Sequence, residues 1–254
     1  MNVARGLRLA VCLVALTAPA AQAQRVLPAA DRIAEAERWA GQRDGRVSFA
    51  IVDSRGRLHA SHGTRAYPAA STTKAMLLVA YLRRTGSAPV PAPVRPILAR
   101  MIRRSGNRAA GAIHAIVGDA GLASVAAAAR MRRFAPDGTW SNVLVTAADQ
   151  ARLFARVDRL VPRRHRPFAR RLLETIVPRQ SWGVPKALRR DGFRVLFKGG
   201  WRRRLVHQAA LIERDGRRIA LAVLTDGNPT HVYGRGTIEG IARRLLATVA
   251  PAPA

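Results

Sequence analysis

The chain has 254 residues, a single cysteine, and 44 Lys and Arg residues against 15 Asp and Glu, which gives a formal charge of +29. This length supports one large domain with a sizeable core, and one cysteine excludes a disulfide within the chain. The arginines are scattered, aromatic residues are few and no nucleic-acid module is recognisable, so specific nucleic-acid binding is disfavoured. The charge by itself allows nonspecific affinity for anionic polymers.

Residues 1–23 have the pattern of an export signal: two arginines, an apolar stretch over 9–18, and alanines at 21 and 23 around a cleavage site. A transmembrane anchor would need about 20 apolar residues, roughly twice this stretch. We therefore expect an exported, periplasmic or secreted, chain of residues 24–254 without Cys12. No later stretch is expected to be long enough to span a membrane, and we expect a monomer.

The hydrophobic pattern predicts the following elements in chain order. The first part has a helix over 31–39, a β-hairpin of 46–53 and 57–60, a helix from Ser71 to Arg84 and a loop over 86–96. The middle has helices over 97–104, 108–117, 124–131, 147–157 (N-capped by Thr146) and 166–176. The last part has strands over 194–198, 205–214 and 217–225, with Asp215-Gly216 as a hairpin turn, and a helix over 237–249.

This order predicts an α/β (α+β) fold made of one domain, 24–254. Its α/β part comprises 31–70 and 190–250, and the helical part comprises 71–189. We expect an antiparallel sheet flanked by the N- and C-terminal helices and packed on an all-helical subdomain, with a site in the crevice between them.

Lysine is rare in this chain: Lys74, Lys186 and Lys198 stand against 41 arginines. Arginine stays protonated in proteins, whereas a buried lysine can lose its proton and act as a base. Lys186 lies in an arginine-rich stretch and is expected to be solvated. Lys74 and Lys198 stand in motifs that suggest chemistry.

Ser71-Thr-Thr-Lys74 lies at a predicted helix start. Residues three apart share a helix face, so the Lys74 amine can approach the Ser71 hydroxyl and activate it as a nucleophile. The positive end of the helix would stabilise an oxyanion there. Alone, this spacing is far more often that of an N-capping serine beside a solvated lysine.

Two further segments add to this pattern. Ser105-Gly106-Asn107 presents a hydroxyl and a carboxamide at a helix junction, and Lys198-Gly199-Gly200 places a lysine on a strand. With Ser71-x-x-Lys74, these segments resemble the S-x-x-K, S-D-N and K-T-G motifs of class A β-lactamases, in the same order. Over roughly residues 31–248 the chain is thus similar to the β-lactamase and penicillin-binding serine acyltransferases.

The resemblance implies a role for each matched residue. Ser71 would be the acylated nucleophile and Lys74 its general base, while Ser105 would relay a proton to the leaving group. Lys198 would supply a positive field near Ser105. Substrate would be bound by Asn107, Gly200 and Trp201, and the oxyanion hole would be the N–H groups of Ser71 and Trp201. No cofactor is implied.

The chain departs from this family at three points. It has no glutamate between Glu37 and Glu174, where class A enzymes carry the residue that activates the deacylating water. Gly199 replaces the threonine of K-T-G, and Gly106 replaces the aspartate of S-D-N. We therefore expect an acyl-enzyme that is hydrolysed slowly. Arg202, Arg203 and Arg204 could replace the lost substrate-carboxylate contact or form a solvated basic turn.

The expected function is that of an exported β-lactamase-like serine hydrolase acylated on Ser71 by β-lactams or related amides. One alternative is a D-Ala-D-Ala-type peptidase or transpeptidase acting on peptidoglycan peptides; the other is a degenerate protein that binds anionic wall polymers. The six histidines lack metal-ligand spacing, so no metal site is expected. A triad of Ser71 with a histidine and an aspartate is formally open but less well placed. His207 is expected to be a core histidine of its strand rather than to border the cleft.

Overall fold

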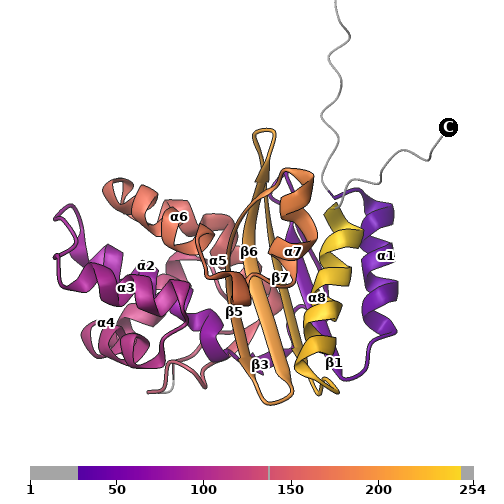
Figure 1. The fold of residues 1–254 in the computed structure, drawn as a ribbon, viewed down its shortest axis with the longest axis horizontal. Helices are drawn as coiled ribbons and strands as arrows, with labels where there is room; N and C mark the ends of the chain where they lie inside the picture. Colours follow the sequence, from indigo (N-terminus) through magenta and orange to yellow (C-terminus); the bar gives the residue numbers. More distant parts are fainter. Residues whose placement is uncertain (1–27, 137, 247–254) are drawn as a thin grey trace, which may run out of the picture.

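The protein is described by a computed structural model covering residues 28–136 and 138–246. The predicted export signal and Cys12 lie outside these residues. The predicted fold class is confirmed: an antiparallel sheet is flanked by the N- and C-terminal helices and packs on a group of helices (Figure 1).

The main sheet has five antiparallel strands in the order β2-β1-β7-β6-β5. Their bounds are β1 Arg46–Val52, β2 Leu58–Ser61, β5 Arg194–Arg202, β6 Leu205–Arg214 and β7 Arg217–Asp226. The two predicted hairpins are present, because Val52 pairs with Leu58 and Arg214 pairs with Arg217. Asp215 and Gly216 both have positive φ, as expected of a two-residue hairpin turn. Strand β5 extends four residues beyond its predicted end at Lys198, so both glycines of the third motif belong to the sheet.

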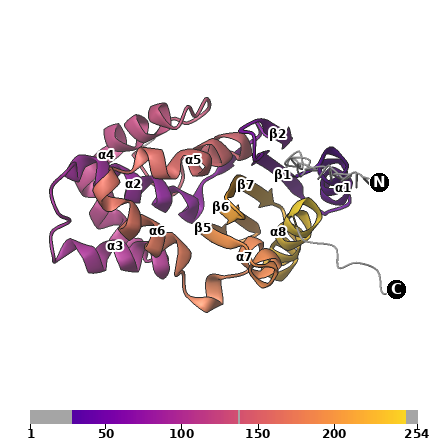
Figure 2. The ribbon, with the colours of Figure 1, turned by 90° about the horizontal axis from the view of Figure 1, so that it is seen from above.

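Helices cover both faces of the sheet, as Figures 1 and 2 show. Helices α1 (Ala30–Gly41) and α8 (His231–Leu246) pack together on one face, beside the short α7 (Val184–Leu188). Helix α5 (Ala147–Leu160) lies on the other face against β1, β6 and β7, and α6 (Arg166–Glu174) contacts β5. The Thr146 hydroxyl caps α5 by accepting the Asp149 N–H at 3.1 Å, as predicted. Helix α8 begins six residues before its predicted start.

The helical part also contains α2 (Lys74–Thr85), α3 (Val94–Arg103) and α4 (Asn107–Ala128). Two predictions need correction here. The loop expected over 86–96 ends where α3 begins at Val94, and the helices predicted over 108–117 and 124–131 are one element. Gly118, with a φ of 61°, kinks this helix, which explains why the hydrophobic pattern appeared broken there.

Two features were not predicted from the sequence. A second, two-stranded sheet joins β3 (Ala66–Pro68) to β4 (Leu144–Thr146) and brings together chain segments far apart in sequence. The helix expected to open at Ser71 begins instead as a 3₁₀ turn, η1 (Ala70–Thr73). Strands β3 and β4 are only three residues long, which is too short for an alternating hydrophobic pattern to be recognised in the sequence.

Helix α4 is long and apolar enough, by length and composition alone, to cross a membrane, which the sequence analysis did not expect. It packs against α2 and α3, and the side chains of Ala110, Ile113 and Leu122 are fully buried. The kink at Gly118 interrupts it midway. One face of α4 thus packs in the helical part, and 33% of its most apolar window is buried.

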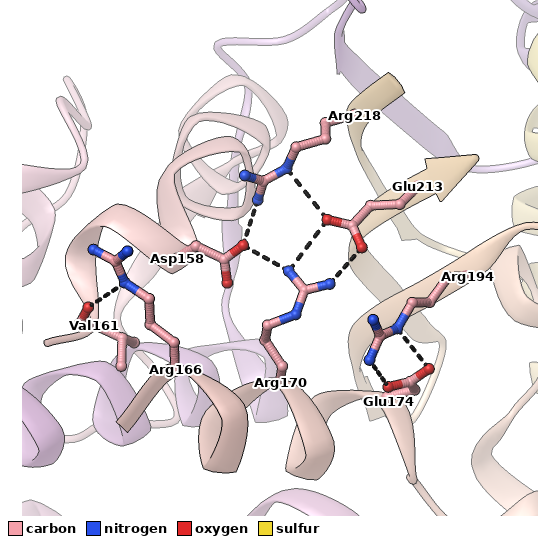
Figure 3. A network of polar contacts seen from close by, with 8 residues as sticks. All are labelled: Asp158, Val161, Arg166, Arg170, Glu174, Arg194, Glu213 and Arg218. Atoms are coloured by element: carbon pink, nitrogen blue, oxygen red, sulfur yellow. Dashed lines mark hydrogen bonds and ion pairs between the residues drawn. The ribbon is translucent and has the colours of Figure 1, made fainter. Parts of the chain in front are cut away.

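A network of ion pairs joins the helices to the sheet (Figure 3). Arg170 of α6 pairs with Asp158 of α5 at 2.6 Å and also with Glu213 of β6. Arg218 of β7 contacts the same two carboxylates, at 2.6 and 3.3 Å. The network thus connects α5 and α6 to the β6–β7 hairpin, at the end of the sheet that carries the hairpin turn.

Candidate active site

The residues of the three sequence motifs meet where the helical part contacts β5. Ser71 lies in η1, Lys74 begins α2, Ser105 precedes α4, and Lys198 lies on β5. Hydrogen bonds link all four side chains. Lys74 and Lys198 are among the largest fully buried side chains of the described residues. The position of Lys186 is different: its side chain is 64% exposed and pairs with Glu239 at 3.0 Å.

The Lys74 amine is held against the Ser71 hydroxyl, with 3.0 Å between Nζ and Oγ. The same nitrogen lies 2.6 Å from the carbonyl oxygen of Ser105 and 2.7 Å from Oδ1 of Asn107. Those two oxygens can only accept hydrogen bonds. A neutral amine would donate its two N–H groups to them, which leaves its lone pair for the hydroxyl proton of Ser71.

The backbone next to the nucleophile and at the second motif adopts an uncommon conformation. Ala70, directly before Ser71, has a φ of 48°, and Ser105 has a φ of 56°. Residues other than glycine adopt such values rarely and at an energetic cost, and such residues cluster at functional sites. At Ser105 this conformation lets both the carbonyl and the hydroxyl reach the Lys74 amine, at 2.6 and 3.3 Å.

Both lysines have lowered pKa values. Burial lowers the pKa of Lys74 to about 8, and burial lowers that of Lys198 well below its ordinary value, helped by the charge of Lys74. Both desolvation and the field of Lys198 were expected to lower the pKa of Lys74; desolvation is the cause for Lys74. The two amines lie 3.3 and 3.2 Å from the same hydroxyl, that of Ser105. Two protonated amines at this distance repel each other. The state in which both lysines are protonated is therefore disfavoured relative to the state in which only one is protonated.

Strand β5 lies directly against η1. A Cβ atom added to Gly200 would come within 2.9 Å of the backbone nitrogens of Ser71 and Thr72, so only glycine fits without a shift. Trp201 follows Gly200 on the same strand. The predicted partners of the oxyanion hole, Ser71 and Trp201, therefore belong to two segments in close backbone contact.

Trp182 explains the glycine that replaces threonine in the third motif. A Cβ atom at Gly199 would lie 3.1 Å from Cζ2 and 3.2 Å from Cη2 of the indole ring. Trp182 also packs edge-on against Trp201, with 6.1 Å between ring centroids. The guanidinium of Arg235 in α8 lies 5.3 Å from the centre of the Trp182 ring. An aromatic wall, capped by an arginine, thus takes the space of a threonine side chain.

A short loop covers the other side of Lys74. The ring centroid of Trp140 lies 4.8 Å from the Lys74 amine. The loop is fixed to the segment before Ser71, because the N–H of Ala70 donates to the carbonyl of Ser141 at 3.0 Å. Arg202 also holds it, through a hydrogen bond of 2.8 Å to Asn142. Trp140 and Trp182 were not predicted as site residues, since no local pattern shows what their rings contact.

The basic run after Trp201 is accounted for mainly by structural contacts. Arg202 donates to Asn142, and Arg204 donates to the carbonyls of Gly227 and Asn228 at 3.1 and 2.9 Å. Arg203 lies in the exposed turn between β5 and β6 with a φ of 44°. Arg202 and Arg204 thus fix loops.

Three acidic residues of the helical part, Asp119, Asp149 and Glu174, have other partners. Asp149 is buried and accepts the N–H groups of Arg132 and Arg133, both at 2.9 Å, and Arg152 at 2.8 Å. Asp119 pairs with His114 at 2.9 Å, and Glu174 pairs with Arg194 at 2.6 Å. None of these contacts involves Ser71 or Lys74.

His207 is a buried histidine of the sheet core. Its Nδ1 accepts the N–H of Thr225 at 3.1 Å, so Nε2 carries the proton and donates to the carbonyl of Pro68, also at 3.1 Å. Burial lowers its pKa to about 4, so the ring is neutral. The ring packs edge-on against Tyr67. His207 is fully occupied by these contacts. Within the described part of the chain, no three His, Cys, Asp or Glu side chains form a group that could hold a metal ion.

Residues 84–249 match the Beta-lactamase enzyme family, and this segment is more than half of the chain. It includes Ser105 and Lys198 and begins after Ser71 and Lys74. The chain belongs to the β-lactamase enzyme family.

Solved structures share the fold at low sequence identity. A β-lactamase from Sphaerobacter thermophilus superposes with a TM-score of 0.73 at 19% identity, covering 84% of this chain and 95% of that chain. PBP-A superposes with a TM-score of 0.73 at 16% identity, covering 85% of this chain and 95% of that chain. The class A β-lactamase from Mycobacterium abscessus superposes with a TM-score of 0.71 at 19% identity, covering 84% of this chain and 97% of that chain. The search of curated proteins gave no match.

Proposed function

We propose that this protein is a serine hydrolase that is acylated on Ser71 by β-lactams or related cyclic amides. The observation that carries the proposal is the position of the Lys74 amine, 3.0 Å from the Ser71 hydroxyl. Its pKa of about 8 makes the neutral form accessible near neutral pH. Lysine is the only basic side chain in contact with that hydroxyl among the described residues.

The reaction follows from these contacts. The Ser71 oxygen attacks the carbonyl carbon of the amide while its proton passes to Lys74. The N–H groups of Ser71 and Trp201 stabilise the resulting oxyanion. The C–N bond then breaks, and Ser105, which contacts both amines, passes a proton to the leaving nitrogen. The product is an ester on Ser71.

Substrate binding involves the remaining predicted residues. Asn107 binds the amide side chain of the substrate with its carboxamide, and its Oδ1 also positions Lys74. Gly200 allows the substrate to approach the β5 backbone, and Lys198 stabilises negative charge near Ser105 when it is protonated. Arg235, stacked on Trp182, is the additional cation that we assign to the substrate carboxylate in place of the missing threonine hydroxyl.

We infer that the acyl-enzyme is hydrolysed slowly. Among the described residues, no carboxylate contacts Ser71 or Lys74. The side chain beside the Lys74 amine is instead the apolar ring of Trp140, which cannot activate a water molecule. A positioned general base contributes about 10²- to 10⁴-fold to a rate. Its loss should leave the ester long-lived.

The test combines two measurements on purified protein. Incubation with a fluorescent penicillin followed by intact-mass analysis should show one adduct, absent in Ser71→Ala. In parallel, nitrocefin should be consumed in an initial burst of one equivalent followed by slow turnover. No adduct after long incubation would rule out acylation of Ser71. Rapid steady hydrolysis of nitrocefin would rule out only the slow deacylation and would leave the acylation standing.

A second candidate is a D-Ala-D-Ala-type peptidase or transpeptidase acting on peptidoglycan peptides. No carboxylate contacts Ser71 within residues 28–136 and 138–246, which favours this candidate because an amine acceptor is a stronger nucleophile than water. A D-alanyl thioester offered with and without a D-amino acid acceptor would distinguish the two. Faster release with the acceptor would favour transfer.

Export remains a proposal that is supported by the sequence of residues 1–23 alone. Expression of the full chain followed by N-terminal sequencing should give a mature protein beginning at Gln24. A retained methionine terminus in the cell extract would contradict it.

A further inference from the structure

The two residues of the first motif differ in their access to solvent: Ser71 is half-buried, whereas Lys74 is fully buried. Four oxygen atoms lie 2.6–3.3 Å from the Lys74 amine and belong to Ser71, Ser105 and Asn107. The face of the Trp140 ring lies over the same amine, with 4.8 Å between Nζ and the ring centroid. A substrate can therefore reach the nucleophile, while the base is enclosed by protein atoms.

The segment that carries Trp140 is held at both of its ends. At its start, the Asp149 carboxylate accepts two backbone N–H groups, both at 2.9 Å. At its end, the carbonyls of Ser141 and Val143 accept the N–H groups of the two residues before Ser71, at 3.0 and 2.9 Å. None of these hydrogen bonds involves the indole ring. Removal of the ring should therefore leave the backbone of the segment in place and open a space beside the amine.

The ring has two opposing effects on the amine. Its π-face attracts a protonated amine, which raises the pKa, and its bulk keeps water away, which lowers the pKa. Burial lowers the pKa of Lys74 to about 8, so the exclusion of water is the larger effect. The charged groups around this place are Lys198 of β5, which contacts the same Ser105 hydroxyl, and Arg202, which holds the segment through Asn142. Both are cations, so neither raises this pKa.

An enclosed amine affects the two halves of the proposed reaction differently. In acylation, the proton comes from the Ser71 hydroxyl, which already lies 3.0 Å from the Lys74 amine, so no water is needed. In hydrolysis of the ester, a water oxygen attacks the carbonyl carbon, the bond to the Ser71 oxygen breaks, and a base carries one proton from the water to that oxygen. Lys74 can serve as this base only if the water stands beside its amine, where the Trp140 ring lies.

We propose that Trp140 is a positioning residue that keeps water from the Lys74 amine and thereby makes the ester on Ser71 long-lived. The inference rests on the proposed acylation of Ser71 and adds the group that controls the next step. Without the ring, a water molecule beside the amine would have the amine and its neighbouring oxygens as hydrogen-bond partners, as a buried water requires. The slow hydrolysis then has a structural cause besides the missing glutamate.

The first measurement follows the loss of the adduct after acylation. The purified protein is labelled with a fluorescent penicillin, excess reagent is removed, and the adduct is followed at neutral pH by intact-mass analysis. Trp140→Ala should shorten the lifetime of the ester about tenfold or more, because a base positioned beside water contributes about 10²- to 10⁴-fold. Trp140→Phe retains an aromatic face over the amine and should retain a lifetime close to that of the wild type.

Phe134→Ala is the matched control. Phe134 is the other aromatic residue of segment 131–143 and is half-buried against the core, so its loss loosens the same segment. The lifetime of the ester should change less than about twofold, because the Trp140 ring stays over the amine. Equal shortening in Phe134→Ala and Trp140→Ala would overturn the proposal, since a looser segment would then be sufficient.

The three lysines give a second readout that needs no acylation. In protein that is isotope-labelled at the lysine Cε atom, nuclear magnetic resonance shows one signal each for Lys74, Lys186 and Lys198, and single substitutions to Arg assign them. Trp140→Ala should raise the pH midpoint of the Lys74 signal by about one unit, toward its ordinary value, because water then solvates the protonated amine. The exposed Lys186 should not respond, and Phe134→Ala should leave the Lys74 midpoint unchanged.

These outcomes separate the role of Trp140 from the proposed function. A wild type that no β-lactam acylates would contradict the proposed function, and the titration of Lys74 would still decide whether Trp140 excludes water. An acylated wild type whose ester has the same lifetime in Trp140→Ala would overturn the role of Trp140 and leave the acylation standing. An unchanged Lys74 midpoint in Trp140→Ala would overturn it as well.

Discussion

At the scale of single residues, the environments of the three lysines differ sharply. Lys74 and Lys198 are fully buried and contact the hydroxyl of Ser105, whereas Lys186 is an exposed partner of Glu239. Burying an amine is costly unless it is hydrogen-bonded or loses its proton. The proposed role of Lys74 needs an amine that can accept a proton, which arginine cannot do, whereas the proposed role of Lys198 is electrostatic.

Substitution of the lysines by arginine separates these roles. Lys74→Arg should lower the rate of Ser71 acylation about 10²- to 10⁴-fold, since a guanidinium cannot accept the proton. Lys198→Arg should have a smaller effect, because its proposed role is electrostatic, and Lys186→Arg should match the wild type. The rates are measured with a fluorescent penicillin, and circular dichroism checks the fold. Equal rates for Lys74→Arg and Lys186→Arg would exclude Lys74 as the base.

The pH dependence of acylation gives a second check on Lys74. Its pKa of about 8 means that the neutral, basic form increases as pH rises. The acylation rate should therefore rise about tenfold per pH unit below pH 8 and level off above it. The folded-state pKa lies below the ordinary 10.5, so the contribution of Lys74 to stability increases between these two values. This change in stability falls above pH 8, so unfolding linked to Lys74 does not explain a rise of the acylation rate below pH 8. An acylation rate that is constant from about pH 6 to about pH 9 would contradict the assignment of Lys74 as the base.

At the scale of elements, the site depends on the close approach of β5 and η1. Ala69 and Ala70, directly before Ser71, donate their N–H groups to the segment before β4, and Gly200 gives β5 the space to lie against η1. The strand and the 3₁₀ turn come from parts of the chain 130 residues apart, if counted from Ser71 to Trp201. Their contact is the structural basis of the predicted oxyanion hole.

Gly200→Ala tests this contact. The added methyl would lie 2.9 Å from two backbone nitrogens, so β5 or η1 must shift, and acylation should fall about 10²-fold. In the matched variant Gly199→Ala the added methyl lies 3.1 Å from the edge of the Trp182 ring, which must move by a few tenths of an ångström, and 3.7 Å from the carbonyl oxygen of His207, an ordinary contact. Its acylation rate should fall less. Similar rates for both variants would show that the approach of β5 is not critical.

The ion-pair network of Figure 3 is a second interaction between elements. Arg170 is 19% exposed and bridges Asp158 to Glu213, so Arg170→Met should destabilise the protein by about 1–3 kcal/mol. Arg194→Met removes an exposed pair with Glu174 and should cost at most about 1 kcal/mol. Urea unfolding measures the loss in free energy of unfolding for both variants, provided that its dependence on urea concentration is the same as in the wild type. A smaller loss for Arg170→Met than for Arg194→Met would be inconsistent with a bridging role.

At the scale of the whole molecule, positive charge exceeds negative charge by 29. Most arginines are on the surface, and many have no carboxylate to pair with. Such a surface attracts anionic polymers without needing a dedicated site. A non-enzymatic protein that binds anionic wall polymers therefore remains the alternative to the proposed hydrolase.

Retention on an anionic wall preparation should fall steeply as salt is raised, because exposed charges are screened beyond about 8–10 Å at physiological ionic strength. Wild type and Ser71→Ala should be retained equally. Acylation of the wild type alone would then show that polymer binding accompanies catalysis. Equal retention without acylation by any β-lactam or peptidoglycan ester would favour the binding protein.

The sequence by itself determined much of the fold. The predicted hairpins, the cap at Thr146 and the helix over 31–39 depend on neighbours within a few residues, so local pattern was sufficient for them. The ends of elements were less certain: β5 continues through Gly199 and Gly200 because pairing with β6 compensates for the low strand preference of glycine. The motif order also pointed to the family.

Only the tertiary structure decided how the site is arranged. The burial of Lys74 and Lys198, and hence the direction of their pKa shifts, arises from packing between segments far apart in sequence. The same holds for Trp182, whose ring occupies the space beside Gly199, and for Trp140, which lies beside the Lys74 amine. Residue type and spacing specify which groups can react, whereas desolvation and contact depend on what the rest of the chain places around them.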